Sequence, residues 1–234
     1  TPQGLMVNFA CHPVDHGGGG AFSAGFPGGL VSRLRSRGWP VAVYLNGAYG
    51  NVSTTNPETG KQPSPEQIAD RLLEHVQRVL DAVAYTNVAT CDSTSTTLSL
   101  PYRAPAEAEI KGMVKGAQRF VEPQCYDDLM PELLARIQLR GTQPAEVQVI
   151  RLGDIHFAGV PAEYFVEHGL RIKEEAWPRR ALVVGGANGM VGYLPTRQAF
   201  KRGGYETTFG FGYRMAPEAG DMMADAALEQ IPRL

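Results

Sequence analysis

Residues 147–161 read Val-Gln-Val-Ile-Arg-Leu-Gly-Asp-Ile-His-Phe-Ala-Gly-Val-Pro. Two runs rich in β-branched and aliphatic residues, Val147–Leu152 and Ile155–Val160, flank the dipeptide Gly153-Asp154. A two-residue glycine-containing connection between such runs is typical of a β-hairpin. The sequence therefore predicts two antiparallel strands joined at Gly153-Asp154.

A helix and a further strand are expected directly after this hairpin. Pro161 is suited to the first turn of a helix, which we expect to run to about Ala176. The apolar run Ala181–Gly185 then predicts another strand. Because a hairpin and a helical crossover occur together, the sequence predicts an α/β fold with a mixed sheet and flanking helices.

The remaining segments extend this α/β pattern. Apolar runs predict strands at Leu5–Cys11, read as buried, and at Val41–Leu45. Ser64-Pro65-Glu66-Gln67 has the pattern of a capped helix start, and apolar residues then recur at helical spacing. Two more helices are expected at about 105–121 and 128–140.

The composition is that of an ordinary globular protein. The chain has 234 residues, 43% hydrophobic and 20% charged, with a net charge of −2 and no basic run, which argues against a nucleic-acid partner. No apolar stretch approaches the roughly 18 residues that a membrane-spanning helix needs. Because the first apolar run starts at residue 5, we expect the chain to begin inside a domain, as a fragment or a processed form would.

Four of the predicted strands lead into residues that could carry chemistry. His12 follows the first strand, Ser53 lies in the loop after Val41–Leu45, and Glu163 and Tyr193 follow later strands. In α/β sheets, sites gather beyond the carboxyl ends of strands. We therefore expect these side chains to converge.

Each residue also has an ordinary structural interpretation. His12 could hydrogen-bond a loop, and Ser53 could belong to a turn. Glu163 is expected in the first turn of a helix, where a carboxylate is favourable without any metal. Tyr193 could be a half-buried aromatic residue.

The functional interpretation is a zinc site. Histidine nitrogen and glutamate oxygen are zinc ligands, and catalytic zinc keeps a position open for a water whose pKa falls to about 7. A phenol has a free pKa of about 10, so the charge of the metal must favour deprotonation of a tyrosine ligand. His16 is a rival ligand, but Pro13 argues against a helix that would place His12 and His16 on one face.

Taken together, the motifs resemble the neutral/alkaline (non-lysosomal) ceramidase family, in order and spacing, over all 234 residues. The segments that carry the resemblance are Asn8–Val14, Gly50–Ser53, Gly159–Phe165 and Ala187–Tyr193. Singly, none of these motifs is specific. Jointly they are.

The resemblance implies roles for five residues. Family members hold zinc with two histidines, a glutamate and a tyrosine, which implies His12, Glu163 and Tyr193 as metal ligands here. Ser53 corresponds to a catalytically required serine, and Tyr205 to a tyrosine beside the substrate amide. The implied reaction is hydrolysis of the linear amide of N-acyl sphingosine, or of a related N-acyl lipid, to a fatty acid and an amine by zinc-activated water.

The resemblance also implies a domain organisation. Residues 1–234 correspond to the C-terminal portion of a single ceramidase-like catalytic domain, with about 103–143 as a helical subdomain or lid. The family's first zinc histidine lies upstream of the strand that opens this chain, and its Gly-Asp before the serine is Gly50-Asn51 here. From the resemblance we also expect the immunoglobulin-like domain of long ceramidases to be missing. Family members are often exported or membrane-facing, which is compatible with peripheral membrane contact.

Two other functions stay open at this point. The chain could be a non-catalytic fragment or remnant of this fold with an incomplete metal site, as the missing histidine suggests. It could also be a metal-independent serine hydrolase using Ser53, although it has no nucleophile-elbow sequence and no recognisable partner for that serine.

Overall fold

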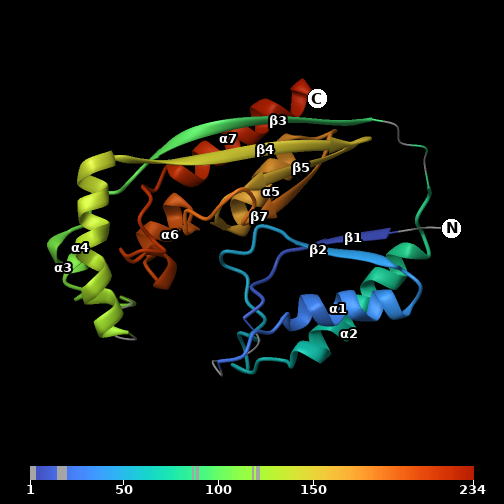
Figure 1. Cartoon of the computed structure of the whole chain (residues 1–234), viewed down its shortest axis with the longest axis horizontal. Coiled ribbons are helices and arrows are strands. Elements are labelled where there is room, and N and C mark those ends of the chain that lie inside the picture. Colours follow the sequence, from blue (N-terminus) through green and yellow to red (C-terminus); the bar gives the residue numbers. More distant parts are fainter. Residues whose placement is uncertain (1–3, 15–19, 86, 88–89, 118, 120–121) are drawn as a thin grey trace.

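The structure is a computed structural model that describes residues 4–14, 20–85, 87, 90–117, 119 and 122–234. It has an upper layer built on a four-stranded sheet, a lower unit containing the N-terminal strand, and a helix-containing arm at one end (Figure 1). The expectation for His16 lies outside the described residues. No helix in the described part of the chain is long and apolar enough to cross a membrane.

The four-stranded sheet confirms the predicted mixed α/β class. Its order is β3 (Cys91–Pro101), β4 (Thr142–Leu152), β5 (Ile155–Val160) and β7 (Arg180–Gly185). The first three strands pair antiparallel, with β4 and β5 joined by the expected turn at Gly153-Asp154, whereas β5 and β7 are parallel. A hairpin and a crossover thus meet in one sheet, as the sequence indicates.

The crossover helix begins later than predicted. α5 spans Val166–Glu175, whereas the sequence places its start at Pro161. The intervening backbone is extended, and β6 (Glu163–Tyr164) pairs in parallel with β8 (Tyr193–Leu194). Glu163 donates its N–H to the Gly192 carbonyl at 3.0 Å. The expectation that Glu163 lies in the first turn of a helix is therefore wrong, because pairing with a distant segment holds it in a strand.

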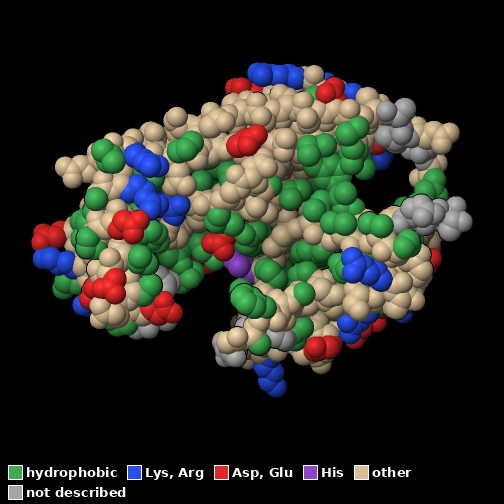
Figure 2. Space-filling view, viewed as in Figure 1, with side chains coloured by type: hydrophobic (Ala, Val, Ile, Leu, Met, Phe, Trp, Pro, Cys, Tyr) green, Lys and Arg blue, Asp and Glu red, His purple; other side chains and the backbone are tan. Residues whose placement is uncertain are grey.

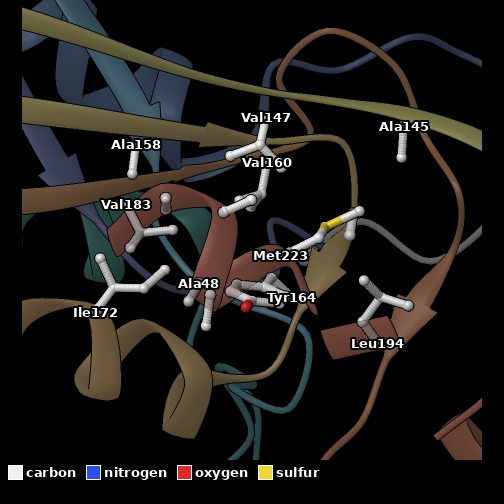
Figure 3. Close-up of a cluster of buried hydrophobic side chains, with 14 of the residues drawn as sticks. Ala48, Ala145, Val147, Ala158, Val160, Tyr164, Ile172, Val183, Leu194 and Met223 are labelled. Carbon is white, nitrogen blue, oxygen red and sulfur yellow. The ribbon is translucent and has the colours of Figure 1, made fainter. Parts of the chain in front are cut away.

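The main hydrophobic core lies between the mixed sheet and two helices, α5 and α7 (Ala219–Gln230). Figure 3 shows Val147, Val160 and Met223 meeting there beside the ring of Tyr164. Tyr164 is fully buried, and its hydroxyl donates to the Gly220 carbonyl at 2.6 Å. This packing places the chain immediately after β5 against a rigid support.

The lower unit is a separate parallel pair, β1 (Gly4–Phe9) and β2 (Val41–Asn46). One face of the pair packs on α1 (Gly25–Ser36) and α2 (Pro65–Leu80). The Ser64-Gln67 capping box at the start of α2 is present as predicted. The unit matters for function because His12 lies three residues beyond the end of β1.

The two helices expected at about 105–121 and 128–140 are present with different bounds. In the segment expected to be a helical subdomain, α3 spans only Glu107–Ile110, and α4 spans Pro123–Arg140. Tyr126, Met130 and Leu133 of α4 form a third apolar cluster with Phe209. The other short helices are α6 (Arg197–Arg202), η2 (Tyr205–Thr207) and η3 (Ile231–Arg233).

Candidate active site

The structure brings together the three residues predicted as metal ligands. Nε2 of His12 lies 3.4 Å from Oε1 of Glu163 and 2.8 Å from the hydroxyl oxygen of Tyr193. Glu163 and Tyr193 are direct partners in the β6–β8 pairing, so they project side by side from adjacent strands. Residues separated by 181 positions in the sequence therefore share one small space.

The backbone of the loop after β2 holds the His12 ring in place. The Val52 carbonyl accepts the His12 backbone N–H at 2.9 Å and lies 3.3 Å from ring atom Nδ1. With the ring proton on Nδ1, Nε2 presents its lone pair to Glu163 and Tyr193, as a metal-binding imidazole requires. The ring of Tyr49 packs edge-on against His12 at 4.9 Å between centroids.

The ionisable groups of the site influence one another strongly. Burial acts to lower the pKa of His12, but hydrogen bonding and the charge of Glu163 outweigh it, so the pKa lies above its ordinary value. Burial and then the charge of Glu163 raise the pKa of the Tyr193 phenol well above its ordinary value. The same two causes raise the pKa of Tyr49 to about 12. A site of this kind favours an added cation.

The donor set fits zinc. Tetrahedral ligand atoms at normal zinc distances lie about 3.3–3.5 Å apart, close to the 3.4 Å between His12 and Glu163. The Tyr193 hydroxyl, now at hydrogen-bond distance from His12, needs only a small outward shift. Within the described residues, no group of three or more His, Cys, Asp and Glu side chains could hold a metal ion. A three-ligand site here therefore depends on the tyrosine oxygen.

Three backbone hydrogen bonds fix the positions of the ligands. Tyr193 donates its N–H to Gly212 at 2.7 Å, Glu163 donates to Gly192, and Gly50 donates to Tyr164 at 2.7 Å. A Cβ at Gly50 would lie 2.4 Å from the Glu163 carbonyl oxygen, so only glycine permits this approach. The glycines that precede Asn51 and Tyr193 are thus part of the site, although periodicity alone does not reveal them.

A cavity of about 440 Å³ opens beside the three ligands. Figure 2 shows the surface hollowed between the α4 arm and the lower unit, with hydrophobic side chains on both sides of the hollow. The residues lining the cavity come from the His12 loop, α4, β6, β8 and the segment before α7: His12, Val14, Glu122, Cys125, Tyr126, Leu129, Met130, Glu163, Tyr193, Tyr205, Gly210, Phe211, Gly212 and Tyr213. Its volume lies in the range of small-molecule sites.

Tyr205, predicted to lie beside the substrate, lines this cavity. Its ring meets Tyr193 and Tyr213 edge-on, at 6.0 and 5.0 Å between centroids. Tyr193 and Tyr213 are stacked at 5.2 Å. The three rings form an aromatic wall next to the ligands, and Tyr205 is its half-exposed outer member.

Ser53 is not among the residues that line this cavity. Its exposed hydroxyl accepts the Thr55 backbone N–H at 3.1 Å, as in an ordinary turn. Ser53 lines a separate cavity of about 300 Å³ together with Arg71 and His75. Its neighbour Val52 contacts the candidate metal site through the carbonyl that lies beside His12.

Asn51, which replaces an aspartate of the resembling family, has a clear structural role. Its Oδ1 accepts the Val166 N–H at the start of α5, and its Nδ2 donates to Oε2 of Glu167, both at 2.8 Å. The side chain therefore ties the loop that holds His12 to the helix that follows Glu163. An aspartate at this position would face the Glu167 carboxylate without a donor.

We expect Glu167→Gln to destabilise the chain when residue 51 is Asn and to stabilise it when residue 51 is Asp. With Asn51, removing the Glu167 charge weakens an exposed charge-assisted hydrogen bond and costs about 0.5–1 kcal/mol. After Asn51→Asp, the same replacement relieves like-charge repulsion and stabilises the chain. A double-mutant cycle from urea unfolding tests this. Equal effects of Glu167→Gln in both backgrounds would contradict the assignment.

Comparison with known proteins supports the fold and leaves the activity to inference. No protein-family model and no curated protein matches the chain. Its mixed sheet and crossover form an α/β fold that is also found in solved ceramidase structures.

The neutral ceramidase from Pseudomonas aeruginosa matches with a TM-score of 0.68 and 18% identity, over 98% of this chain and 44% of that chain. A structure described as ceramidase complexed with C2 matches with a TM-score of 0.69 and 16% identity, over 97% of this chain and 45% of that one. The chain therefore has the fold of part of a ceramidase. It spans less than half the length of these structures.

Proposed function

We propose that the chain is a zinc-dependent hydrolase of linear amides, of the ceramidase type, acting on N-acyl sphingosine or a related N-acyl lipid. The observation that carries this proposal is the meeting of His12, Glu163 and Tyr193 at one side of a largely apolar cavity. The fold shared with two ceramidase structures supports the same class of reaction.

The residues of the site would divide the work as follows. His12, Glu163 and Tyr193 hold the metal through a ring nitrogen, a carboxylate and a phenol oxygen. Zinc bound there would polarise the amide carbonyl and supply a water of lowered pKa, which is the chemistry that amide hydrolysis needs. Val52 keeps the His12 ring in the metal-binding orientation through its carbonyl. Tyr205, at the outer edge of the aromatic wall, hydrogen-bonds the substrate amide.

The cavity contributes by excluding water. Aromatic and aliphatic side chains surround the ligand side, so hydrogen bonds and charges act there in a medium of lower effective dielectric than bulk solvent. An amide placed with its carbonyl toward zinc held at this site would leave its hydrocarbon portion against α4 and Phe211. Peripheral contact with a membrane surface is compatible with this arrangement because the hollow is open to solvent.

Zinc content is the deciding measurement. We expect near-stoichiometric zinc by elemental analysis of the purified chain, and its loss in the His12→Ala/Glu163→Ala double variant. The matched control is Glu74→Ala/His75→Ala, which removes an exposed glutamate and histidine on α2 and should keep the metal. Zinc-loaded protein is then assayed on N-acyl amides, with hydrolysis expected to follow zinc occupancy.

A folded wild-type chain without zinc would overturn the proposal. That result would favour a non-catalytic remnant. The observation in favour of this alternative is that, within the described residues, a three-ligand site needs a tyrosine oxygen. Hydrolysis that survives removal of the metal and disappears in Ser53→Ala would instead favour the serine hydrolase. The hydrogen bond that the Ser53 hydroxyl accepts from Thr55 gives that alternative less support than the metal site has.

A further inference from the structure

One wall of the cavity is a single helix face. Cys125, Tyr126, Leu129 and Met130 of α4 line the cavity, at the spacing that places residues on one side of a helix. Tyr126 and Met130 are buried, whereas Leu129 is 36% exposed. Tyr126 and Met130 therefore form the buried base of an apolar wall, and the partly exposed Leu129 forms its rim.

This helix face is held in place by its own packing. The Tyr126 hydroxyl donates to the Glu109 carbonyl, which ties α4 to α3. Met130 and Leu133 pack with Phe209, from the segment that also carries residues 210–213 of the opposite wall. Because α4 is packed on both sides, it cannot easily shift to make room for a longer ligand. The wall can therefore discriminate between hydrocarbon chains of different length.

The charges around the cavity restrict what the wall accepts. Among the described residues that line it, the carboxylates are Glu122 and Glu163, and there is neither lysine nor arginine. At the α4 wall, away from the proposed metal, a carboxylate carried in by a ligand would lose hydration without gaining a lysine or arginine partner. An uncharged hydrocarbon chain has no charge to desolvate, and its burial in the cavity is favourable.

We infer that Leu129 and Met130 on α4 set the length of an unbranched, uncharged hydrocarbon chain attached to the substrate amide. The identity of the substrate in this inference rests on the proposed amide hydrolysis. The preference for a chain length rests on the α4 wall alone. The hydrocarbon chain could belong to the acyl part or to the amine part of the amide. Both have the same chemistry and differ only in which side of the carbonyl faces α4.

Leu129→Trp is the first test, because Leu129 lies at the rim and its replacement does not disturb the buried base of the wall. Zinc-loaded protein is assayed on N-methyl amides from butanoyl to hexadecanoyl, and on N-acetyl amines of matching lengths. For wild type, kcat/KM should rise about fourfold per methylene, equivalent to about 0.8 kcal/mol, until the wall is covered. In Leu129→Trp the rise should end at a shorter chain.

The matched control is Leu139→Trp, on the same helix, 82% exposed and outside the cavity lining. For the longest chain, Leu129→Trp should lose about tenfold or more in kcat/KM, carried by KM, and Leu139→Trp should match wild type. The series that responds, acyl or amine, identifies the chain that contacts α4. If neither series shifts in Leu129→Trp, the inference is wrong.

A second readout does not depend on catalysis. Cys125 lines the cavity and Cys91 is exposed at the start of β3, so the same molecule carries a reporter and a reference thiol. Straight-chain alcohols from butanol to dodecanol should slow maleimide labelling of Cys125 increasingly with length and leave Cys91 unchanged. Leu129→Trp should remove the protection by the longer alcohols, and ω-carboxylated analogues should protect poorly.

The two readouts separate the inference from the proposed function. Length-dependent protection of Cys125 in a chain that hydrolyses no amide supports the wall and overturns only the amide hydrolase. Amide hydrolysis with no length dependence and no protection of Cys125 overturns the wall and leaves the hydrolase standing. Equal protection by carboxylated and uncharged chains overturns the charge argument on which the inference depends.

Discussion

Tyr193→Phe is expected to weaken zinc binding by about 100-fold or more while leaving the fold intact. The change deletes one oxygen and retains the ring, so the stacking on Tyr213 at 5.2 Å and on His12 at 5.7 Å is preserved. Loss of a residue that merely orients a ligand typically lowers metal affinity 10–100-fold, and loss of a ligand should exceed this. Competition with a chromophoric zinc chelator measures the affinity.

The control is Tyr213→Phe, which removes a phenol oxygen from the same stack and the same cavity. Zinc affinity in that variant should stay close to the wild-type value. Both metal-free variants should stay folded in thermal unfolding because their ring packing is retained, although Tyr193→Phe should lose about 0.5–1.5 kcal/mol with its hydrogen bond to His12. Equal zinc affinity in Tyr193→Phe and wild type would remove tyrosine from the ligand set, leaving two ligands, too few for a catalytic zinc site.

The sequence predicts the fold best where the signal is local. The β4–β5 turn and the capping box at Ser64 each lie within a few residues, and the structure confirms both. The strand at Leu5–Cys11 is present, but the burial expected of it is incomplete, with Met6 47% and Phe9 38% exposed. An apolar run indicates a strand reliably, but the cover on each of its faces depends on what packs there.

The sequence motifs predict which residues belong to the candidate site, but they do not predict the geometry of that site. β6 and β8 have two residues each, too short for any periodicity, and they pair across thirty positions of sequence. Pro161 and Glu163 are favourable at a helix start, so local propensity predicts a helix there. The hydrogen bond from Glu163 to Gly192 overrides that propensity. Contacts between distant segments cannot be derived from either segment alone.

The α4 wall shows the same limit in another form. The helix at 128–140 is predicted, but the structure extends it to Pro123, and the added turn carries Cys125 and Tyr126 into the cavity. Nothing in the spacing of those residues indicates that they line the same cavity as the candidate metal ligands. Their role depends on the third apolar cluster, which joins α4 to Phe209.

Gly192→Ala is expected to be the most damaging single substitution at this site. Gly192 has a φ of +92°, and a Cβ there would lie 2.3 Å from the Gly212 carbonyl oxygen. The strained dihedral and the overpacking each cost about 1–3 kcal/mol, which together approach the total stability of many domains. The Gly192 carbonyl accepts from Glu163, and Gly212 accepts from Tyr193, so relief of the clash must move two ligands.

Gly212→Ala is the matched control for this clash, because it lies across the same contact and a Cβ there would meet nothing within 4 Å. Urea unfolding should show a loss of about 3 kcal/mol or more for Gly192→Ala and a change within about 0.5 kcal/mol for Gly212→Ala. If Gly212→Ala accumulates as soluble protein and Gly192→Ala does not, the result likewise indicates that Gly192→Ala is the less stable variant. Equal stability of the two variants would mean that the backbone at Gly192 does not approach Gly212 as closely as the structure shows. The backbone hydrogen bond from Tyr193 to Gly212 would then not set the position of the Tyr193 side chain, and the proposed metal site would lose that part of its structural basis.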